Sequence, residues 1–349
     1  MAPIEFRSTT ERFSILNPFQ DFAAQEQCVE VRTDPILGDV SVYNPLLKEK
    51  SRAFLGENDA ELIGKIVEDT GKSCIFCGDA VATKTTKYPP ELIPDGRITK
   101  GEAVLFANLF AVAKYHAVIV LSKAHFLKLS EFAPELLANG FRAAQEFLHA
   151  VQRLDGTAHH ATVNANYLQP AGASQVHPHM QMLITPEPYS YQQRLLEASD
   201  RYHAENGTSC FVDLIAEEKR IGARYIAQTG KWHWLAAFAP MGGNEVIAVH
   251  EEQADFGVLS DEDIADLSAG IARVLSFYEN RGHLSFNYTL FSASGSADHR
   301  GTRCLFKIIT RQNLYTNYRN DDYFLQKLLQ SELIFKLPEE LAKELTMRW

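Results

Sequence analysis

The residues with the most specific chemistry form the run His177-Pro178-His179-Met180-Gln181, which follows the small-residue loop Gly172-Ala173-Ser174. In an extended strand alternate side chains share a face, so the two imidazoles and the amide point one way and the apolar residues between them point the other. An imidazole can attack phosphorus, a second can bind a metal, and an amide can donate a hydrogen bond to a phosphate oxygen. The run therefore predicts phosphoryl chemistry on one wall of a pocket.

A second group with chemical potential is Cys74-Ile75-Phe76-Cys77. The spacing suits one tetrahedral zinc ion or a redox pair, and simple burial is a third reading. The other three of the five cysteines are dispersed, as is typical of a reducing compartment. The spacing by itself leaves metal binding, redox chemistry and burial open.

Composition limits the class of protein. The chain has 349 residues, of which 46% are hydrophobic and 22% charged, enough for one large domain or two of moderate size. The formal charge of -10 argues against general nucleic-acid binding, which normally requires a basic excess. The sequence has no apolar run of membrane-spanning length, and its first residues include charges where a signal peptide is apolar. We expect a cytoplasmic protein with neither a nucleic-acid nor a membrane partner.

Strands and helices that position these residues recur in a repeated order. Apolar alternation and helical spacing predict two strands, a helix and a third strand before the His-Pro-His run, and the same series after it. The first series covers 104–111, 117–122, 130–154 and 161–166, and the second covers 234–238, 245–250, 261–281 and 284–291. Asn166 and Asn287 close equivalent strands, which indicates an internal duplication. The second copy has no His-x-His after its Asn, so the chemistry is expected in the first.

Three further segments are predicted from turn and cap signals. Residues 1–55 form an N-terminal arm with a strand at 40–43, and residues 84–100, rich in proline, form an irregular loop. The tail 321–349 is expected to be helical, with Pro338 at a helix start.

Taken together, the motifs resemble a known family. Cys74-x-x-Cys77, Val118 to His125, Asn166 and Gly172 to Gln181 are similar to the histidine-triad (HIT) superfamily. The Gln at 181 in place of a last histidine resembles the galactose-1-phosphate uridylyltransferase branch, as do residues 32–38 and 106–111. The resemblance implies an α+β fold made of two tandem HIT-type halves, with an antiparallel half-barrel sheet packed by helices. Residues 1–185 would form the half with the arm, zinc site and catalytic strand, and 186–349 the degenerate half.

The resemblance also implies roles. His179 is the expected nucleophile, taking a nucleoside monophosphate from a nucleoside diphosphate sugar and passing it to a sugar 1-phosphate, with a main-chain carbonyl near His177 binding its other nitrogen. Gln181 and Ser174 would share the charge on the phosphoryl oxygens. The expected substrate-binding residues are Phe106, Asn108, Asn166, Gly172, Ala173, Arg32 and Lys307. One structural zinc per chain would be bound by Cys74, Cys77, His125 and His177, with His116 as a competing ligand.

Several alternatives stay open at this level. The family's second metal site is not expected, because the corresponding stretch is Leu305-Phe306-Lys307. An ordinary solvated side chain is an alternative role for Lys307.

The main prediction is a uridylyltransferase-type enzyme of galactose metabolism, active as a homodimer. A phosphorylase acting on a nucleoside diphosphate sugar or a dinucleoside polyphosphate would use the same nucleophile with phosphate as the acceptor. A third possible function is that of a zinc-containing nucleotide-binding protein without catalytic activity. A hydrolase is disfavoured by Gln181, because an amide cannot shuttle protons.

Overall fold

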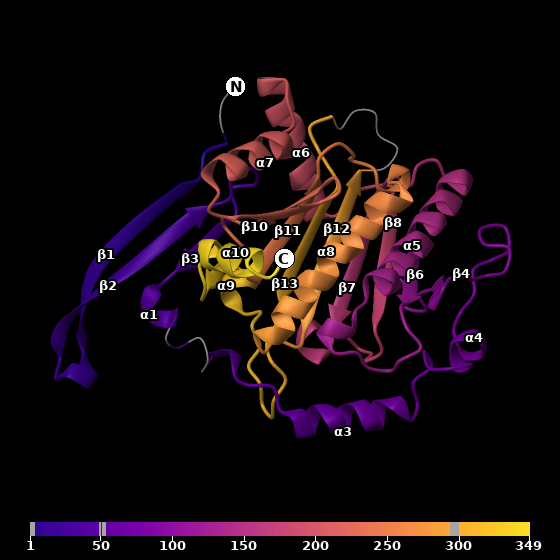
Figure 1. The fold of residues 1–349 in the computed structure, drawn as a ribbon, viewed down its shortest axis with the longest axis horizontal. Coiled ribbons are helices and arrows are strands. Elements are labelled where there is room, and N and C mark those ends of the chain that lie inside the picture. The colour runs from indigo at the N-terminus through magenta and orange to yellow at the C-terminus, as the bar shows by residue number, and fades with distance from the viewer. Residues whose placement is uncertain (1–3, 49, 51–53, 294–299) are drawn as a thin grey trace.

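A ten-stranded antiparallel sheet forms the centre of the protein. The computed structural model describes residues 4–48, 50, 54–293 and 300–349 (Figure 1). The sheet has the order β4-β5-β6-β8-β7-β12-β13-β11-β10-β9. Its strands are β4 (Ile98–Lys100), β5 (Ala103–Ala107), β6 (Tyr115–Val120), β7 (His160–Tyr167), β8 (His179–Thr185), β9 (Tyr225–Thr229), β10 (Trp232–Ala236), β11 (Gly243–His250), β12 (Phe286–Ala293) and β13 (Leu305–Thr310).

The two sides of this sheet have the same topology. Outward from the central β7–β12 pair, one side is ordered β8, β6, β5, β4 and the other β13, β11, β10, β9. Asn166, near the end of β7, lies opposite Asn287, near the start of β12, so the prediction that both asparagines close equivalent strands was wrong. This order supports the internal duplication, and the division at residue 185 stays a prediction.

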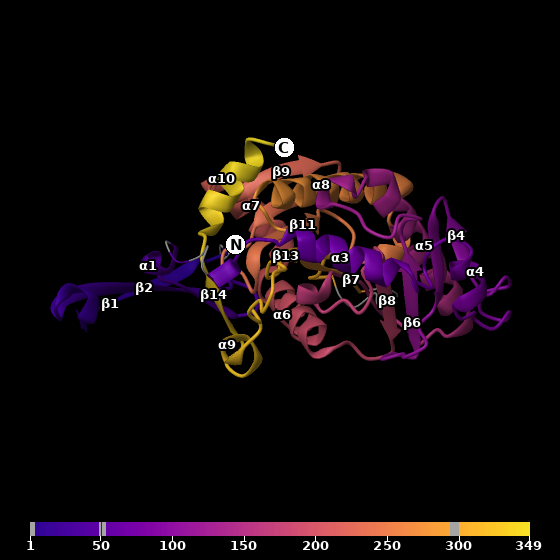
Figure 2. The ribbon, with the colours of Figure 1, turned by 90° about the horizontal axis from the view of Figure 1, so that it is seen from below.

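Two long helices cover one face of the sheet, as Figures 1 and 2 show. They are α5 (Pro134–Leu154) and α8 (Asp261–Asn280), close to the predicted ranges. Ser260 caps α8, because its hydroxyl accepts from the backbone N–H of Asp263 and the Asp263 carboxylate accepts from the backbone N–H of Ser260. Gly270 lets α8 approach the sheet, since a Cβ there would lie 1.9 Å from the Trp234 ring. Met180 and Met182 of β8 point into this core.

The opposite face is covered only in part by long helices. Over the second half lie α6 (Ser190–Asn206) and α7 (Cys210–Ile221), whose Leu195 and Phe211 pack against Leu235 and Val249 of the sheet. Over the first half, this face presents His179 and Gln181, which alternate with the buried methionines. The helices α1 (Pro45–Lys48), α3 (Ala60–Gly71) and α4 (Ala80–Lys84) precede β4 in the chain. The expected site therefore lies on the face of the first half away from α5 and α8.

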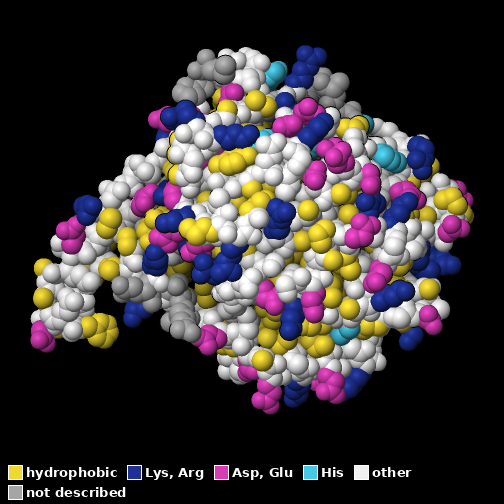
Figure 3. All heavy atoms as spheres, viewed as in Figure 1, with side chains coloured by type: hydrophobic (Ala, Val, Ile, Leu, Met, Phe, Trp, Pro, Cys, Tyr) yellow, Lys and Arg dark blue, Asp and Glu magenta, His cyan; other side chains and the backbone are white. Residues whose placement is uncertain are grey.

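A second, four-stranded sheet has the order β1-β2-β3-β14. Its strands are β1 (Arg7–Asn17), β2 (Ala23–Thr33), β3 (Val40–Tyr43) and β14 (Ser331–Ile334). The bounds of β3 are as predicted, whereas no bounds were predicted for the two 11-residue strands β1 and β2 of the hairpin. The hairpin projects from the body (Figure 2), with hydrophobic side chains along it (Figure 3), including the exposed Phe13, Leu16, Phe19 and Phe22.

The prediction of a helical C-terminal tail was wrong in part. The tail contains α9 (Phe324–Lys327), then β14, then α10 (Pro338–Thr346), which begins at Pro338 as predicted. Residues 331–334 form a strand because they pair in parallel with β3, almost 300 positions earlier in the chain. In the part of the chain that the structure describes, no helix combines the length and apolarity needed to cross a bilayer.

Candidate active site

His179 begins β8 with its side chain oriented by the backbone. Its Nδ1 lies 2.8 Å from the carbonyl oxygen of His177. A carbonyl only accepts, so Nδ1 donates its proton and Nε2 keeps a lone pair. The ring is 8% exposed, and burial lowers the pKa of His179 despite the opposing effect of that hydrogen bond. A neutral imidazole with a free Nε2 lone pair is the form that can attack an electrophile.

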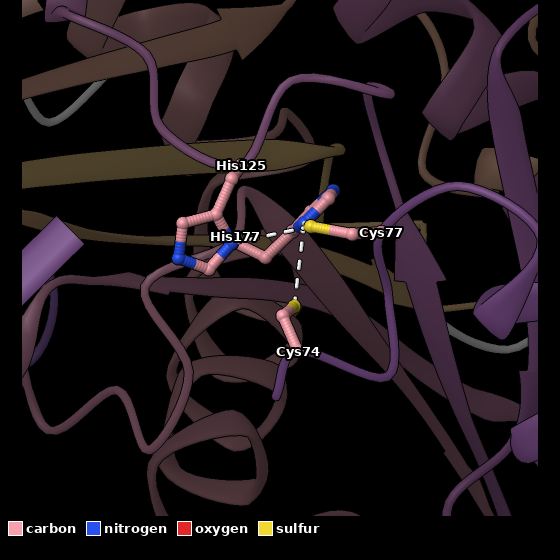
Figure 4. A group of neighbouring side chains, drawn as sticks. All are labelled: Cys74, Cys77, His125 and His177. Atoms are coloured by element: carbon pink, nitrogen blue, oxygen red, sulfur yellow. Dashed lines mark hydrogen bonds between the residues drawn. The ribbon is translucent and has the colours of Figure 1, made fainter. Parts of the chain in front are cut away.

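Four potential metal ligands converge next to this strand (Figure 4). Ligand atoms of Cys74, Cys77, His125 and His177 all lie within 4.8 Å of one another. The Sγ of Cys77 is 3.3 Å from Nδ1 of each histidine, and the Sγ of Cys74 is 3.6 Å from Nδ1 of His177. Two thiols and two imidazoles form a donor set that suits tetrahedral zinc, so this cluster can bind a metal.

Hydrogen bonds on the far side of both rings fix the orientation of the cluster. Nε2 of His177 donates to the carbonyl oxygen of Ser122 at 2.7 Å, which leaves its Nδ1 facing the cysteines. Nε2 of His125 lies 2.9 Å from the hydroxyl of Thr70 on α3. Such outer partners are usual behind metal-binding histidines. Phe76, between the two cysteines, packs against the rings of both His177 and His179.

Gln181 lies at the centre of a cluster of polar side chains that we did not predict from the sequence. Its Oε1 is 2.8 Å from Nε2 of His116 on β6 and 3.3 Å from Nδ2 of Asn108. His116 thus contacts Gln181, whereas we had considered it only as an alternative metal ligand. The signal in the sequence was that His116 shares a face of its strand with Val118 and Val120. Because Val118 of β6 pairs with Gln181 of β8, this is also the face that bears Gln181. Phe106, the other predicted residue of this segment, is 4% exposed and packs against Phe76.

The loop before β8 and the central strand pair form another side of the site. Gly172 has φ +83°, a conformation that favours glycine. Gly172 and Ser174 are exposed, and Ala173 between them is buried. Asn166 accepts from Nδ2 of Asn287 at 2.6 Å, and that same group also donates to the carbonyl oxygen of Ala171 at 2.9 Å. The two asparagines thereby connect the central pair to the loop.

Arg32 lies in a different environment from the one we predicted. Its guanidinium pairs with Glu30 at 2.7 Å and Glu339 at 3.0 Å and lies over the ring of Phe238. Because these carboxylates already neutralise a cation that is only 6% exposed, we withdraw Arg32 as a substrate contact.

Lys307 is also committed to partners within the chain. Its ammonium is 2.8 Å from Glu245 and 2.8 Å from the hydroxyl of Tyr191. Burial lowers the pKa of Lys307, but the Glu245 carboxylate and Tyr191 outweigh that effect and raise it above its ordinary value. Lys307 is therefore neither a solvated side chain nor a free phosphate contact, and we withdraw it too.

A sizeable cavity lies apart from His179. It measures about 470 Å³ and is lined mainly by the end of β13, the segment after it, and β14, including Arg311, Asp321 and Glu332. Neither His179 nor Gln181 lines it. The chemistry is thus expected on the uncovered sheet face and not in this cavity.

Solved structures share this architecture. An ADP-glucose phosphorylase from Arabidopsis thaliana, with bound ADP-glucose, has a TM-score of 0.70 and 16% identity, over 91% of this chain and 98% of that one. A GalT-like protein from the same plant has a TM-score of 0.69 and 16% identity, over 91% and 99%. A uridylyltransferase has a TM-score of 0.65 and 16% identity, over 91% and 98%.

This chain has the same fold as these uridylyltransferase, GalT-like and ADP-glucose phosphorylase structures. The predicted resemblance and fold class are thereby confirmed. No family model matches the sequence. A protein of Archaeoglobus fulgidus described as uncharacterized is 31% identical over 347 residues, covering 99% of each chain, so the two belong to one sequence family.

Proposed function

We propose that this protein is a nucleotidyltransferase that moves a nucleoside monophosphate between a nucleoside diphosphate sugar and a sugar 1-phosphate. In the first step Nε2 of His179 attacks the α-phosphorus, an N–P bond forms, and the bond to the bridging oxygen breaks to release the sugar 1-phosphate. In the second step a phosphate oxygen of the acceptor attacks, and the N–P bond breaks. The observation that best supports this proposal is the hydrogen bond that Nδ1–H of His179 donates to the His177 carbonyl oxygen, because it leaves Nε2 as the attacking atom.

The neighbouring polar groups have roles in this proposal that follow from their chemistry. The amide of Gln181, the hydroxyl of Ser174 and the backbone N–H groups of the Gly172–Ser174 loop would donate to the phosphoryl oxygens as negative charge develops. Phe106 and Asn108 are proposed on the nucleotide side, and Asn166 with Gly172 and Ala173 on the side of the leaving sugar phosphate. None of these groups readily takes a proton from an attacking water, which favours transfer over hydrolysis.

The metal cluster is proposed to bind one structural zinc ion. Zinc with four protein ligands keeps no open position for water, so it would cross-link chain segments and leave the chemistry to His179. His177 is one ligand, and its carbonyl oxygen is the group that orients His179. The cluster thereby connects Cys74, Cys77 and His125 to the start of the catalytic strand.

Two phosphate compounds are candidates for the acceptor of the nucleotidyl group, and in both a phosphate oxygen is the attacking atom. A sugar 1-phosphate makes the enzyme a uridylyltransferase of the galactose pathway type, and inorganic phosphate makes it a phosphorylase. The likeness to the fold of ADP-glucose phosphorylase supports keeping the second candidate. In either form we propose a cytoplasmic homodimer, as the family resemblance implies.

Product analysis tests the proposal. The protein is incubated with UDP-, ADP- and GDP-glucose in turn, with either galactose 1-phosphate or inorganic phosphate as acceptor, and the nucleotide products are separated. We expect turnover with at least one donor, lost in His179→Asn and kept in the control His159→Asn, which lies just before β7. Galactose 1-phosphate as the effective acceptor supports the transferase, and phosphate supports the phosphorylase. No turnover with any pair, with nucleotide binding intact, overturns the enzyme in favour of a binding protein.

A further inference from the structure

His116, at the start of β6, makes two hydrogen bonds that determine which of its nitrogens has the proton. The backbone N–H of Val112 donates to its Nδ1 at 3.1 Å, and its Nε2 lies 2.8 Å from Oε1 of Gln181. A backbone N–H only donates, so Nδ1 has the lone pair and Nε2 the proton. Nε2–H therefore donates to the Gln181 amide oxygen. The ring is 5% exposed, and burial lowers the pKa of His116 despite the opposing bond from Gln181, in agreement with a neutral ring.

Asn108 reinforces the same orientation of the Gln181 amide. Its Oδ1 accepts from the backbone N–H of Phe110 at 2.8 Å, so its Nδ2 is the end that faces the pair, at 3.3 Å from Oε1 of Gln181 and 3.1 Å from Nε2 of His116. Because Nε2 of His116 has the proton, it does not accept from Nδ2, and Oε1 is the acceptor for both nitrogens. The amide oxygen of Gln181 thus receives two donors. Among the residues that the structure describes, no hydrogen bond is found for Nε2 of Gln181. The NH2 group is the end left available to a ligand.

We infer that His116 is a positioning residue, which holds the Gln181 amide so that its NH2 group, and not its oxygen, meets the phosphoryl oxygens. The inference rests on the proposed function, because it gives Gln181 a phosphoryl group to meet. A reversed amide would set a carbonyl oxygen against phosphoryl oxygens, and the donor would be lost where negative charge develops.

Two substitutions at 116 separate the role of the donor from the role of the side chain in packing. In His116→Gln an amide N–H replaces Nε2–H, whereas His116→Glu offers oxygens that accept from Gln181 and reverse its amide. We measure single-turnover release of sugar 1-phosphate and KM for both. We expect a loss of about threefold for His116→Gln and about 100-fold for His116→Glu, in the rate and not in KM, as for removal of one oxyanion donor.

The Gln181→Leu background tests whether His116 acts through Gln181. If it does, His116→Glu has less than about a threefold further effect there, because the two substitutions are not additive. Equal losses for Gln and Glu at 116, or the same Glu effect in both backgrounds, would overturn the inference. A purely structural role predicts one of these two results.

A readout without turnover keeps this inference apart from the proposed function. Nitrogen NMR of protein labelled at histidine reports the His116 tautomer. In protein labelled at glutamine, the side-chain amide signal of Gln181 is followed during titration with UMP. We expect the Nε2–H tautomer and a shift of the Gln181 NH2 signal. An Nδ1–H tautomer, or an unmoved amide signal with UMP bound, refutes the positioning role even if no reaction is found. Absence of turnover alone refutes only the proposed function.

Discussion

Glu332 on β14 gives the protein a pH-dependent stability whose sign can be worked out. The side chain is 8% exposed, and burial raises its pKa from 4.5 to about 7, against the hydrogen bonds from Gln326 and the Leu333 N–H. The folded state therefore binds the proton more tightly than the unfolded chain. Stability contributed by this group is complete below pH 4.5 and is lost as the pH rises to about 7. At about 1.4 kcal/mol per pKa unit the loss is about 3 kcal/mol.

The substitution Glu332→Gln removes the charge and keeps an oxygen for both hydrogen bonds. We expect the variant to be about 2 to 3 kcal/mol more stable than the wild type at pH 8 and equal to it, within about 0.5 kcal/mol, at pH 4.5. Denaturation in urea at pH 4.5, 6, 7 and 8, followed by the fluorescence of the three tryptophans, measures this difference. Glu205→Gln, at an exposed position on α6, is the matched control and should show no such trend. Parallel curves for wild type and Glu332→Gln across the range would refute the reasoning.

Three further predictions follow from packing, charge and metal binding. Gly270→Ala should destabilise the fold by about 1 to 3 kcal/mol, because its Cβ meets the Trp234 ring; an unchanged melting temperature would contradict the close approach. Lys307→Met should cost about 3 to 5 kcal/mol by leaving Glu245 buried without its partner, whereas a raised KM at unchanged stability would restore Lys307 as a substrate contact. Metal analysis should find about one zinc per chain, falling to a small fraction in Cys74→Ser and unchanged in Cys28→Ser; a stable protein purified without metal would disprove the site.

Local patterns in the sequence were sufficient for many elements. The bounds of β3 and the start of α10 agree with the predictions, because alternation and a proline at a helix start are local signals. The β14 strand could not be recognised, since its only strand partner in the described chain is β3, far away in sequence. The long hairpin was missed because β1 is exposed over almost its whole length and so lacks a buried, apolar alternation.

The candidate site could likewise be predicted from the sequence only in part. The residue types and spacing of the run 177–181 and of Cys74 and Cys77 indicated phosphoryl chemistry and a metal site, and the fold brings the four metal-binding candidates together. Arg32 and Lys307 could not be judged from sequence, since their carboxylate partners Glu339 and Glu245 are defined only by the tertiary structure. His116 was undervalued for a related reason, because its contact with Gln181 depends on the pairing of β6 with β8.

The most direct test of the account is to trap the covalent intermediate. The protein is mixed with each nucleoside diphosphate sugar without acceptor, quenched in mild alkali to preserve an N–P bond, and weighed intact by mass spectrometry. We predict a gain of one nucleotidyl group on His179, assigned by peptide mapping, absent in His179→Asn and discharged by galactose 1-phosphate or phosphate. Turnover of the same donor with no adduct, or an adduct that persists in His179→Asn, would contradict the account.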